Sequence, residues 1–280
     1  MASRKRCDLS RLAVNVGELL RRPAGTVSPV DAEWIVAHVL GLTRSELTSQ
    51  RNAPATTEQV EHATALVARR AAGEPLQYVL GEWGFRRLTL TVDRRALIPR
   101  PETEIVVERC LALLAGYDSP RVLDVGTGSG AIALAIADEH PGARVTGTDA
   151  SREALALARE NAVRTGIELA LEANDLFAGL PAGPWELVVS NPPYVDPAER
   201  ESLAAEVRDW EPAAALFGRE ATEAVAQGAA DVLVDGGALV LEVGDGQAAG
   251  VSRLLAGLGY ADVVVTPDLA GRDRVVEGRR

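Results

Sequence analysis

Four consecutive residues, Asn191-Pro192-Pro193-Tyr194, follow the apolar run 187–190 and point most directly to chemistry. The Asn191 amide oxygen and the Pro192 carbonyl oxygen are two neighbouring hydrogen-bond acceptors. The prolines have a fixed φ and no N–H, so no backbone donor competes beside these acceptors. Tyr194 adds an aromatic face. Such a site suits a planar NH2 group, either a carboxamide or the exocyclic amine of a base, although a strand-ending turn without a ligand uses similar residues.

A second informative segment is glycine-rich and runs from Asp124 to Gly130. It has the pattern of a strand that enters a tight turn and then a helix, and glycines let a backbone approach a ligand closely. Asp149 ends the next predicted strand about 20 residues further on, where an acidic side chain can bind ribose hydroxyls. A nicotinamide dinucleotide and S-adenosylmethionine both fit, because the dinucleotide pattern tolerates an alanine such as Ala131 at its third glycine position.

Acidic residues around this turn favour S-adenosylmethionine. Asp124 would repel a pyrophosphate but suits a sulfonium or an amino group. Asp175 could bind an adenine amine, and Leu176 could pack on the ring. A turn without any ligand is the structural alternative. The residues predicted to bind the cofactor on this basis are Asp124, Gly126, Thr127, Gly128, Ser129, Gly130, Asp149, Asp175 and Leu176.

Methyl transfer from a sulfonium requires a nucleophile held in line, about 3 Å away. An amide or aryl amine nitrogen is a weak nucleophile because its lone pair is delocalised. Asn191 and the Pro192 carbonyl could accept both N–H bonds of that NH2 group, which would fix its plane and favour the positive charge that develops on nitrogen. Tyr194 could stack on the group. The sequence has no histidine or lysine near this motif to act as a base, and this chemistry needs none before attack.

Composition excludes several classes of protein. The 280 residues carry a net charge of −11, with 12 basic and 9 acidic residues in 1–88 against 17 and 31 in the remainder. An acidic chain is a poor non-specific binder of nucleic acid. No apolar run reaches the roughly 18–20 residues of a membrane span. Cys7, Cys110 and the three histidines show no metal-ligand spacing, so we expect no metal and a reducing, cytoplasmic location.

The periodicity of apolar residues changes along the chain. Residues 8–82 show helical spacing, with helix start signals at Ser28-Pro29 and Thr56-Thr57. Alternation from Gly84 to Val92 predicts a hairpin, and Pro101-Glu102 begins a helix that reaches about Leu114. Beyond it, strands and helices alternate, which predicts an α/β fold with a mainly parallel sheet and an antiparallel end. The predicted strands are 121–125, 144–149, 167–172, 187–190, 237–243, 262–266 and 274–277, with helices starting near Ser129, Ser151 and Ala221.

The motifs together resemble one known family, the protein glutamine N(5)-methyltransferases of the HemK/PrmC type, over nearly the whole chain. The glycine turn is shared by many methyltransferases, whereas the segments Gly73–Gly81 and Leu97–Glu104 are more specific to this family. The resemblance also includes Asn191 to Tyr194 and the segment Val207–Leu216.

The resemblance implies a class I, Rossmann-like methyltransferase domain over 99–280, a hairpin linker over 83–98 and a helical domain over 1–82 that docks the protein substrate. The reaction would be methylation of the glutamine in the Gly-Gly-Gln loop of class I peptide chain release factors. Asn191 would also contact S-adenosylmethionine, and Asn191, Pro192, Pro193 and Tyr194 would hold the glutamine. Arg100 and Glu102 would lie at the mouth of the site as substrate contacts; alternatively Arg100 would form a salt bridge with Glu102 or Glu104.

Three alternative functions remain at the level of sequence. A glutamine methyltransferase acting on a ribosomal protein differs in the segment after Pro99-Arg100. A DNA adenine N6-methyltransferase has a similar Pro-Pro-Tyr pocket, but it would need a basic groove and a base-reading domain, and residues 89–280 are acidic. A non-catalytic binding protein with this fold would not need an intact Asn191.

Overall fold

The computed structural model describes residues 14–23, 25–218 and 220–280. Its chain divides into two compact units, which meet in sequence between Leu80 and Gly81. Within the described residues, no helix combines the length and the apolar character needed to cross a membrane.

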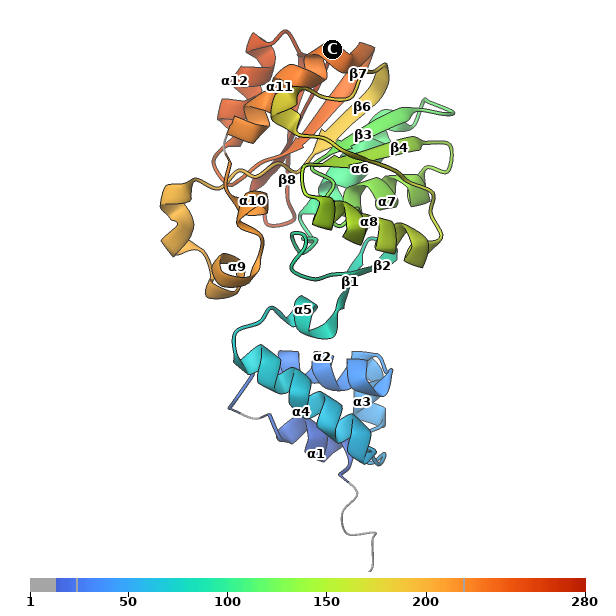
Figure 1. Ribbon diagram of the computed structural model, residues 1–280, viewed down its shortest axis with the longest axis vertical. Coiled ribbons are helices and arrows are strands. Elements are labelled where there is room, and N and C mark those ends of the chain that lie inside the picture. The colour runs from blue at the N-terminus through green and yellow to red at the C-terminus, as the bar shows by residue number, and fades with distance from the viewer. Residues whose placement is uncertain (1–13, 24, 219) are drawn as a thin grey trace, which may run out of the picture. The chain divides into compact units, whose positions relative to one another are not determined.

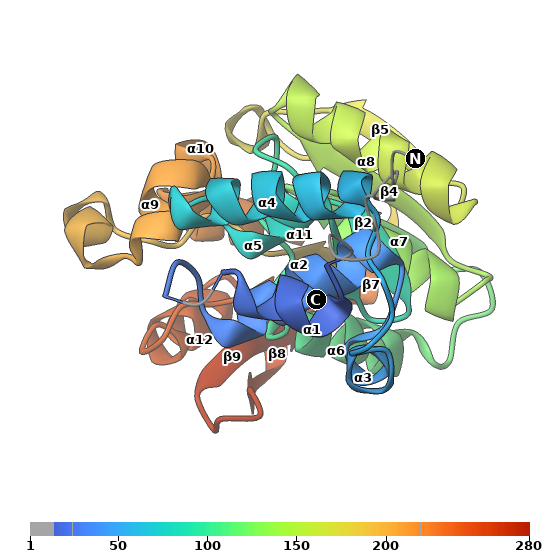
Figure 2. The same cartoon turned by 90° about the horizontal axis from the view of Figure 1, so that it is seen from below.

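The N-terminal unit is helical, as its periodicity predicted (Figures 1 and 2). The second helix contacts the first, third and fourth, and Ile35 and Val36 on it are fully buried. The side chains of Ser28 and Thr56 cap two of the helices, at the predicted start signals. The part of the first predicted helix before residue 14 lies outside the described residues. The helices are α1 (Val16–Arg21), α2 (Pro29–Leu40), α3 (Arg44–Ser49), α4 (Thr57–Ala71) and α5 (Leu76–Leu80).

The C-terminal unit opens with a hairpin of β1 (Glu82–Phe85) and β2 (Leu88–Thr91), which pair antiparallel. Phe85 and Leu90 are buried in the main hydrophobic core of this unit. The hairpin is therefore part of the packed C-terminal unit.

A seven-stranded sheet forms the centre of the C-terminal unit, in the order β5-β4-β3-β6-β7-β9-β8. Strands β3 to β7 pair in parallel, while β9 runs antiparallel to both β7 and β8. The predicted α/β class, the parallel sheet and the antiparallel end are thus confirmed. The strands are β3 (Arg121–Val125), β4 (Arg144–Asp149), β5 (Ala170–Ala173), β6 (Trp185–Ser190), β7 (Leu233–Glu242), β8 (Ala261–Pro267) and β9 (Asp273–Arg279).

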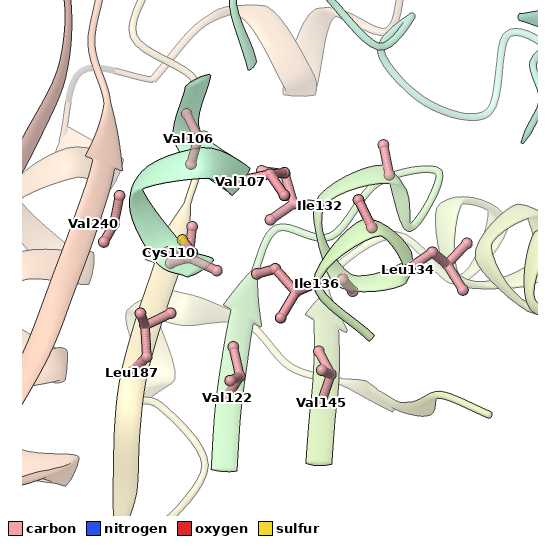
Figure 3. Close-up of a cluster of buried hydrophobic side chains, with 14 of the residues drawn as sticks. Val106, Val107, Cys110, Val122, Ile132, Leu134, Ile136, Val145, Leu187 and Val240 are labelled. Atoms are coloured by element: carbon pink, nitrogen blue, oxygen red, sulfur yellow. The ribbon is translucent and has the colours of Figure 1, made fainter. Parts of the chain in front are cut away.

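Alternating strand residues divide the core into two layers. Leu187 and Val189 of β6 face a cluster that α6 and α7 cover (Figure 3), whereas Val188 faces the cluster beneath α11 and α12. Buried parallel strands need cover on both faces, which explains their continuous apolar sequences. The helical elements of this unit are α6 (Thr103–Leu114), α7 (Ala131–Glu139), α8 (Arg152–Thr165), η2 (Leu176–Ala178), η3 (Pro197–Ser202), α9 (Ala205–Trp210), α10 (Ala213–Leu216), α11 (Glu220–Val232) and α12 (Ala248–Gly257).

The strand order creates a switch point at the centre of the sheet. From β3 the chain builds outward through β4 and β5, then returns so that β6 pairs with the other side of β3. Ligands of open α/β sheets bind beyond the carboxyl ends of the strands at such a point. The segments that follow β3, β4, β5 and β6 contain nearly every residue predicted to bind the cofactor, and the fold therefore gathers those segments at one edge.

Candidate active site

The glycine-rich turn after β3 has the backbone conformation that only glycine adopts easily. Gly126, Gly128 and Gly130 have φ values of 72°, 56° and 83°. The turn is tied to β4, because the Thr127 N–H donates to the Thr148 carbonyl at 2.8 Å. Helix α7 begins at Ala131, directly after Gly130, and among the described residues no side chain caps its N-terminus. The turn therefore presents a close backbone approach beside a helix N-terminus, where a polar ligand is favoured.

Asp149 holds this turn from the end of β4. One carboxylate oxygen accepts from the Gly128 N–H at 2.9 Å, and the other accepts from the Ser151 N–H at 2.8 Å. Each carboxylate oxygen has room for a further hydrogen bond. Asp149 can thus shape the turn and still accept from a ribose hydroxyl, and the second role remains a prediction.

Asp124 lies beneath the turn and is fully buried. One oxygen accepts from the Thr127 hydroxyl at 2.6 Å, while Oδ1 has no hydrogen-bond partner among the described residues. Burial raises the pKa of Asp124 to about 7, while the Thr127 hydroxyl and the nearby Ala133 backbone N–H oppose the shift. A buried acceptor without a partner favours a nearby donor or cation, which fits the amino group or sulfonium of S-adenosylmethionine.

Asn161, which was not predicted as a site residue, holds the Ser129 backbone in place. The side chain of Asn161, on α8, donates to the Ser129 carbonyl at 2.9 Å and accepts from the Thr91 N–H at 2.7 Å. Asn161 therefore links α8, the hairpin and the glycine turn. A buried asparagine within a helix of otherwise apolar inward positions is the signal that could have identified it.

The segment after β5 is more open. Asp175 caps η2, since its side chain accepts from the Phe177 N–H at 3.0 Å. Leu176 packs against the core cluster beneath α11, while Phe177 is 65% exposed. Contacts of Asp175 and Leu176 with an adenine ring remain predictions.

The Asn191-Pro192-Pro193-Tyr194 segment starts where β6 ends. The Ser190 hydroxyl donates to the Val125 carbonyl at 2.7 Å, which fixes the end of β6 beside the end of β3. Pro192 is buried, and Asn191, Pro193 and Tyr194 are half-buried. Behind the segment, the Gln247 side chain donates to the Tyr194 carbonyl at 2.9 Å. Asn191 is thereby positioned beside the glycine turn, at the central switch point of the sheet.

Two further residues, Thr103 and Glu242, contact this segment and were not selected from the sequence. Asn191 Nδ2 donates to Thr103 Oγ1 at 3.3 Å, and the Thr103 hydroxyl donates to Glu242 Oε2 at 2.6 Å. The Tyr194 hydroxyl donates to the other oxygen of Glu242 at 3.4 Å. An acidic residue at the end of the apolar run 238–241 is the signal that could have revealed Glu242.

Burial governs the ionisation of these groups. It raises the pKa of Glu242, although the Thr103 hydrogen bond and the charge of Arg274 oppose the shift. Burial, together with the nearby Glu242 charge, raises the pKa of Tyr194 to about 12. Tyr194 is therefore a neutral phenol at neutral pH and acts as a hydrogen-bond donor and an aromatic surface.

Arg100 pairs with Glu211, which corrects the alternative in which it pairs with Glu102 or Glu104. Arg100 Nη2 lies 2.5 Å from Glu211 Oε1, and the second Glu211 oxygen accepts from the Ile98 N–H at 3.2 Å. Glu102 instead lies 3.6 Å from Arg272. Sequence reasoning missed both partners because each lies far along the chain. Substrate contacts of Arg100 and Glu102 remain predictions. No group of three or more potential metal ligands occurs within residues 14–23, 25–218 and 220–280.

Known proteins that are similar to this chain over almost its full length share one name. A release factor glutamine methyltransferase of Deinococcus radiodurans is 44% identical over 92% of this chain and 93% of its own length. Its counterpart from Chlorobaculum tepidum is 43% identical over 88% of each chain. The chain belongs to the release factor glutamine methyltransferase family. The family resemblance expected from the motifs is therefore confirmed.

Family models match both units of this release factor glutamine methyltransferase family member. The model described as the PrmC N-terminal domain matches residues 23–81, and the methyltransferase small domain matches residues 103–208. The second match includes the glycine turn, Asp149 and Asn191. Among solved structures, the release factor-specific protein-(glutamine-N5) methyltransferase of Alicyclobacillus acidocaldarius is 34% identical and covers 65% of this chain and 94% of its own, with a TM-score of 0.43.

Proposed function

We infer that this protein transfers a methyl group from S-adenosylmethionine to the side-chain amide nitrogen of the glutamine in the Gly-Gly-Gln loop of class I peptide chain release factors. The observation that carries this inference is Asn191, whose amide nitrogen bonds to Thr103 beside the glycine turn. Its amide oxygen is then directed away from Thr103, as an acceptor for a planar NH2 group. Membership of the family supports the choice of glutamine and of release factor.

The residues of the glycine turn fit S-adenosylmethionine. Gly126, Gly128 and Gly130 allow close approach, and Asp149 would accept from ribose hydroxyls. Asp124 Oδ1 is a buried acceptor without a hydrogen-bond partner among the described residues. When bound, the cofactor supplies an electrophilic methyl group on a sulfonium. Asp175 and Leu176 would lie on the adenine side, and Asn191 would stand between the cofactor and the substrate.

The residues of the protein would contribute to the reaction by positioning the substrate amide and by stabilising the charge that develops on its nitrogen. Asn191 Oδ1 and the Pro192 carbonyl would accept the two N–H bonds of the substrate amide, which holds its plane and favours the charge that develops on nitrogen. Tyr194, a neutral phenol at neutral pH, would stack on the amide. Glu242 is buried and bonded to Thr103 and Tyr194, so the proton of the methylated amide would leave to solvent.

The two units would have different roles, substrate docking and methyl transfer. We assign docking of the release factor to residues 1–82, a linking hairpin to 83–98 and methyl transfer to 99–280. The match of the PrmC N-terminal domain to residues 23–81 supports a family-specific front part. The release factor is the proposed partner in the cytoplasm. The acidic charge of residues 89–280 supports a protein substrate over direct binding to nucleic acid.

The function is tested by methyl transfer from labelled S-adenosylmethionine to an intact class I release factor. The matched control is the same release factor with the loop glutamine replaced by alanine. We expect label in the first protein and none in the second. Equal labelling of both would reject the assigned residue, and absence of labelling with cofactor binding intact would reject the assigned substrate.

A further inference from the structure

A continuous set of hydrogen bonds connects the Asn191 amide to the interior of the C-terminal unit. It runs from Asn191 Nδ2 to Thr103 Oγ1 at 3.3 Å, and from Thr103 Oγ1 to Glu242 Oε2 at 2.6 Å. The three residues come from the end of β6, the first turn of α6 and the end of β7. Thr103 is 4% exposed and Glu242 is 1% exposed, so water cannot readily replace either partner.

The direction of these bonds follows from proton counting. A threonine hydroxyl has one proton to donate and lone pairs to accept. With Glu242 ionised, its carboxylate takes the Thr103 proton, so Thr103 can only accept from Asn191. The group of Asn191 that faces Thr103 must therefore be its NH2, and the amide oxygen must point the other way.

We propose that Thr103 and Glu242 are positioning residues that fix which way the Asn191 amide faces, so that its oxygen and not its nitrogen meets the substrate NH2 group. This inference rests on the proposed function, because it concerns the same site. A flipped Asn191 would present two donors to an amide nitrogen that also carries donors. Such a contact would repel the substrate and lose the stabilisation of the developing charge.

Glu242 has a second partner at the same site. Its other oxygen accepts from the Tyr194 hydroxyl at 3.4 Å. The buried Glu242 carboxylate thus bonds directly to Tyr194 and is connected to Asn191 through Thr103. These two side chains, Asn191 and Tyr194, would hold the substrate amide. The same carboxylate therefore sets the relative placement of the two.

The experiment reverses the direction of the bonds while the total charge is kept. In the Asn191→Asp variant, two carboxylates compete for the single Thr103 proton. When Asn191→Asp is combined with Glu242→Gln, the amide introduced at position 242 can donate to Thr103, and the Thr103 hydroxyl can donate to the carboxylate introduced at position 191. One oxygen of that carboxylate still faces the substrate, and the oxygen of the introduced amide can still accept from Tyr194.

The four proteins of this cycle are compared by single-turnover methyl transfer to the release factor at saturating cofactor. We expect Asn191→Asp to lose about 10²-fold in rate, as a misplaced reacting group does. Glu242→Gln alone keeps the original direction and should lose less than about tenfold. The double variant should be at least about tenfold faster than Asn191→Asp, because the two changes are coupled. A double variant no faster than Asn191→Asp would overturn the proposal.

Thermal unfolding of the same four proteins without any ligand gives a second readout, because the bonds exist in the free protein. Asn191→Asp should lower the melting temperature, and adding Glu242→Gln should raise it again. Additive losses would overturn the proposal. If the wild-type protein fails to methylate release factor, the proposed function is wrong. The thermal unfolding of the four proteins then still tests the proposed orientation of the Asn191 amide.

Conservative variants separate positioning from packing. Thr103→Val keeps the shape but removes the hydroxyl, and it should lower kcat about 10²-fold with KM for the release factor changed far less. Thr103→Ser restores the hydroxyl and should return most of kcat. Thr64→Val, on α4 in the N-terminal unit, also removes a hydroxyl, which donates to the Val60 carbonyl, and as the matched control it should leave kcat unchanged. Equal losses in Thr103→Val and Thr103→Ser would contradict the positioning role.

Discussion

The helix caps of the N-terminal unit and the polar side chains at the candidate active site bond over very different separations along the chain. In the N-terminal unit, the capping residues Asn15, Thr43 and Thr56 bond to residues only three positions away. At the candidate active site, Thr103 bonds to Glu242 over 139 positions and Arg100 to Glu211 over 111 positions. The first kind of bond caps the start of a helix. The second kind brings distant segments of the C-terminal unit to one place.

This difference assigns separate effects to substitutions in the two units. A lost cap costs local helix stability and should leave the chemistry untouched, because its partners lie within one turn. A lost long-range bond at the sheet edge changes the relative placement of groups that would hold the substrate.

Replacing Asn191 with alanine should have the largest effect. The variant loses the acceptor for the substrate amide, so we expect kcat to fall about 10³-fold, comparable to the loss of one donor from an oxyanion hole. Affinity for S-adenosylmethionine, measured by calorimetry, should change by less than about tenfold, because the turn and Asp149 remain. Turnover near that of the wild type would show that Asn191 does not hold the reacting group.

Removing Arg100 should destabilise the C-terminal unit. The Glu211 side chain is 1% exposed and would lose its cation, which costs about 3–5 kcal/mol in the free energy of unfolding. Glu211→Gln should cost less, since glutamine still accepts from Ile98 and the Arg100 side chain is 29% exposed and can be hydrated. Urea unfolding compares the two variants. Equal losses would mean that the pair does not carry this stability.

Most of the fold could be predicted because its signals are local. Apolar periodicity and alternation identified β3 and β4 to the residue, and the caps Ser28 and Thr56 marked two helix starts. Helix α12 was missed although Val251, Leu254, Leu255 and Leu258 recur at helical spacing, because no side chain caps its start and marks where it begins. Helix α5 lies within the predicted helical stretch 8–82 but was not recognised as a separate helix, because its five residues are too short for a periodic pattern.

Only part of the candidate site could be predicted from the sequence. The glycine turn and the Asn191 segment are contiguous motifs, so their residue types reveal them. Thr103 and Glu242 act through a bond between α6 and β7, and nothing in the spacing of the chain specifies that pairing. The same reason explains why Glu211 was not recognised as the partner of Arg100.

Asp124 should make stability depend on pH in an unusual direction. Burial raises its pKa from 3.8 to about 7 in the folded protein. The stability that the folded protein gains from protonated Asp124 is therefore fully present below about pH 4 and is lost as the pH rises to about 7. Between about pH 5 and pH 8, the free energy of unfolding of the wild type should fall by about 2–3 kcal/mol relative to that of Asp124→Asn, because one pKa unit corresponds to about 1.4 kcal/mol.

Thermal unfolding of both proteins over this pH range measures the difference. The Asp124→Asn variant keeps an acceptor for the Thr127 hydroxyl, so the comparison isolates the charge. A stability difference that stays constant from pH 5 to 8 would show that Asp124 keeps an ordinary pKa.

Thr56→Ala tests the other side of the comparison and should have the smallest effect. It removes the cap of α4 and should cost about 1 kcal/mol in unfolding free energy. The kcat for methyl transfer should stay unchanged, because the bonds at the sheet edge are intact. A fall in kcat at saturating substrate would show that the N-terminal unit takes part in the chemical step as well.

The most direct test of the central claim is the position of the methyl group on a release factor produced together with this protein. Fragment mass spectra of the peptide that contains the Gly-Gly-Gln sequence should show one added methyl group on the glutamine side-chain nitrogen. Production with the Asn191→Ala variant should leave that glutamine unmodified. An unmodified glutamine with the wild-type protein, or a methyl group on another residue, would contradict the account.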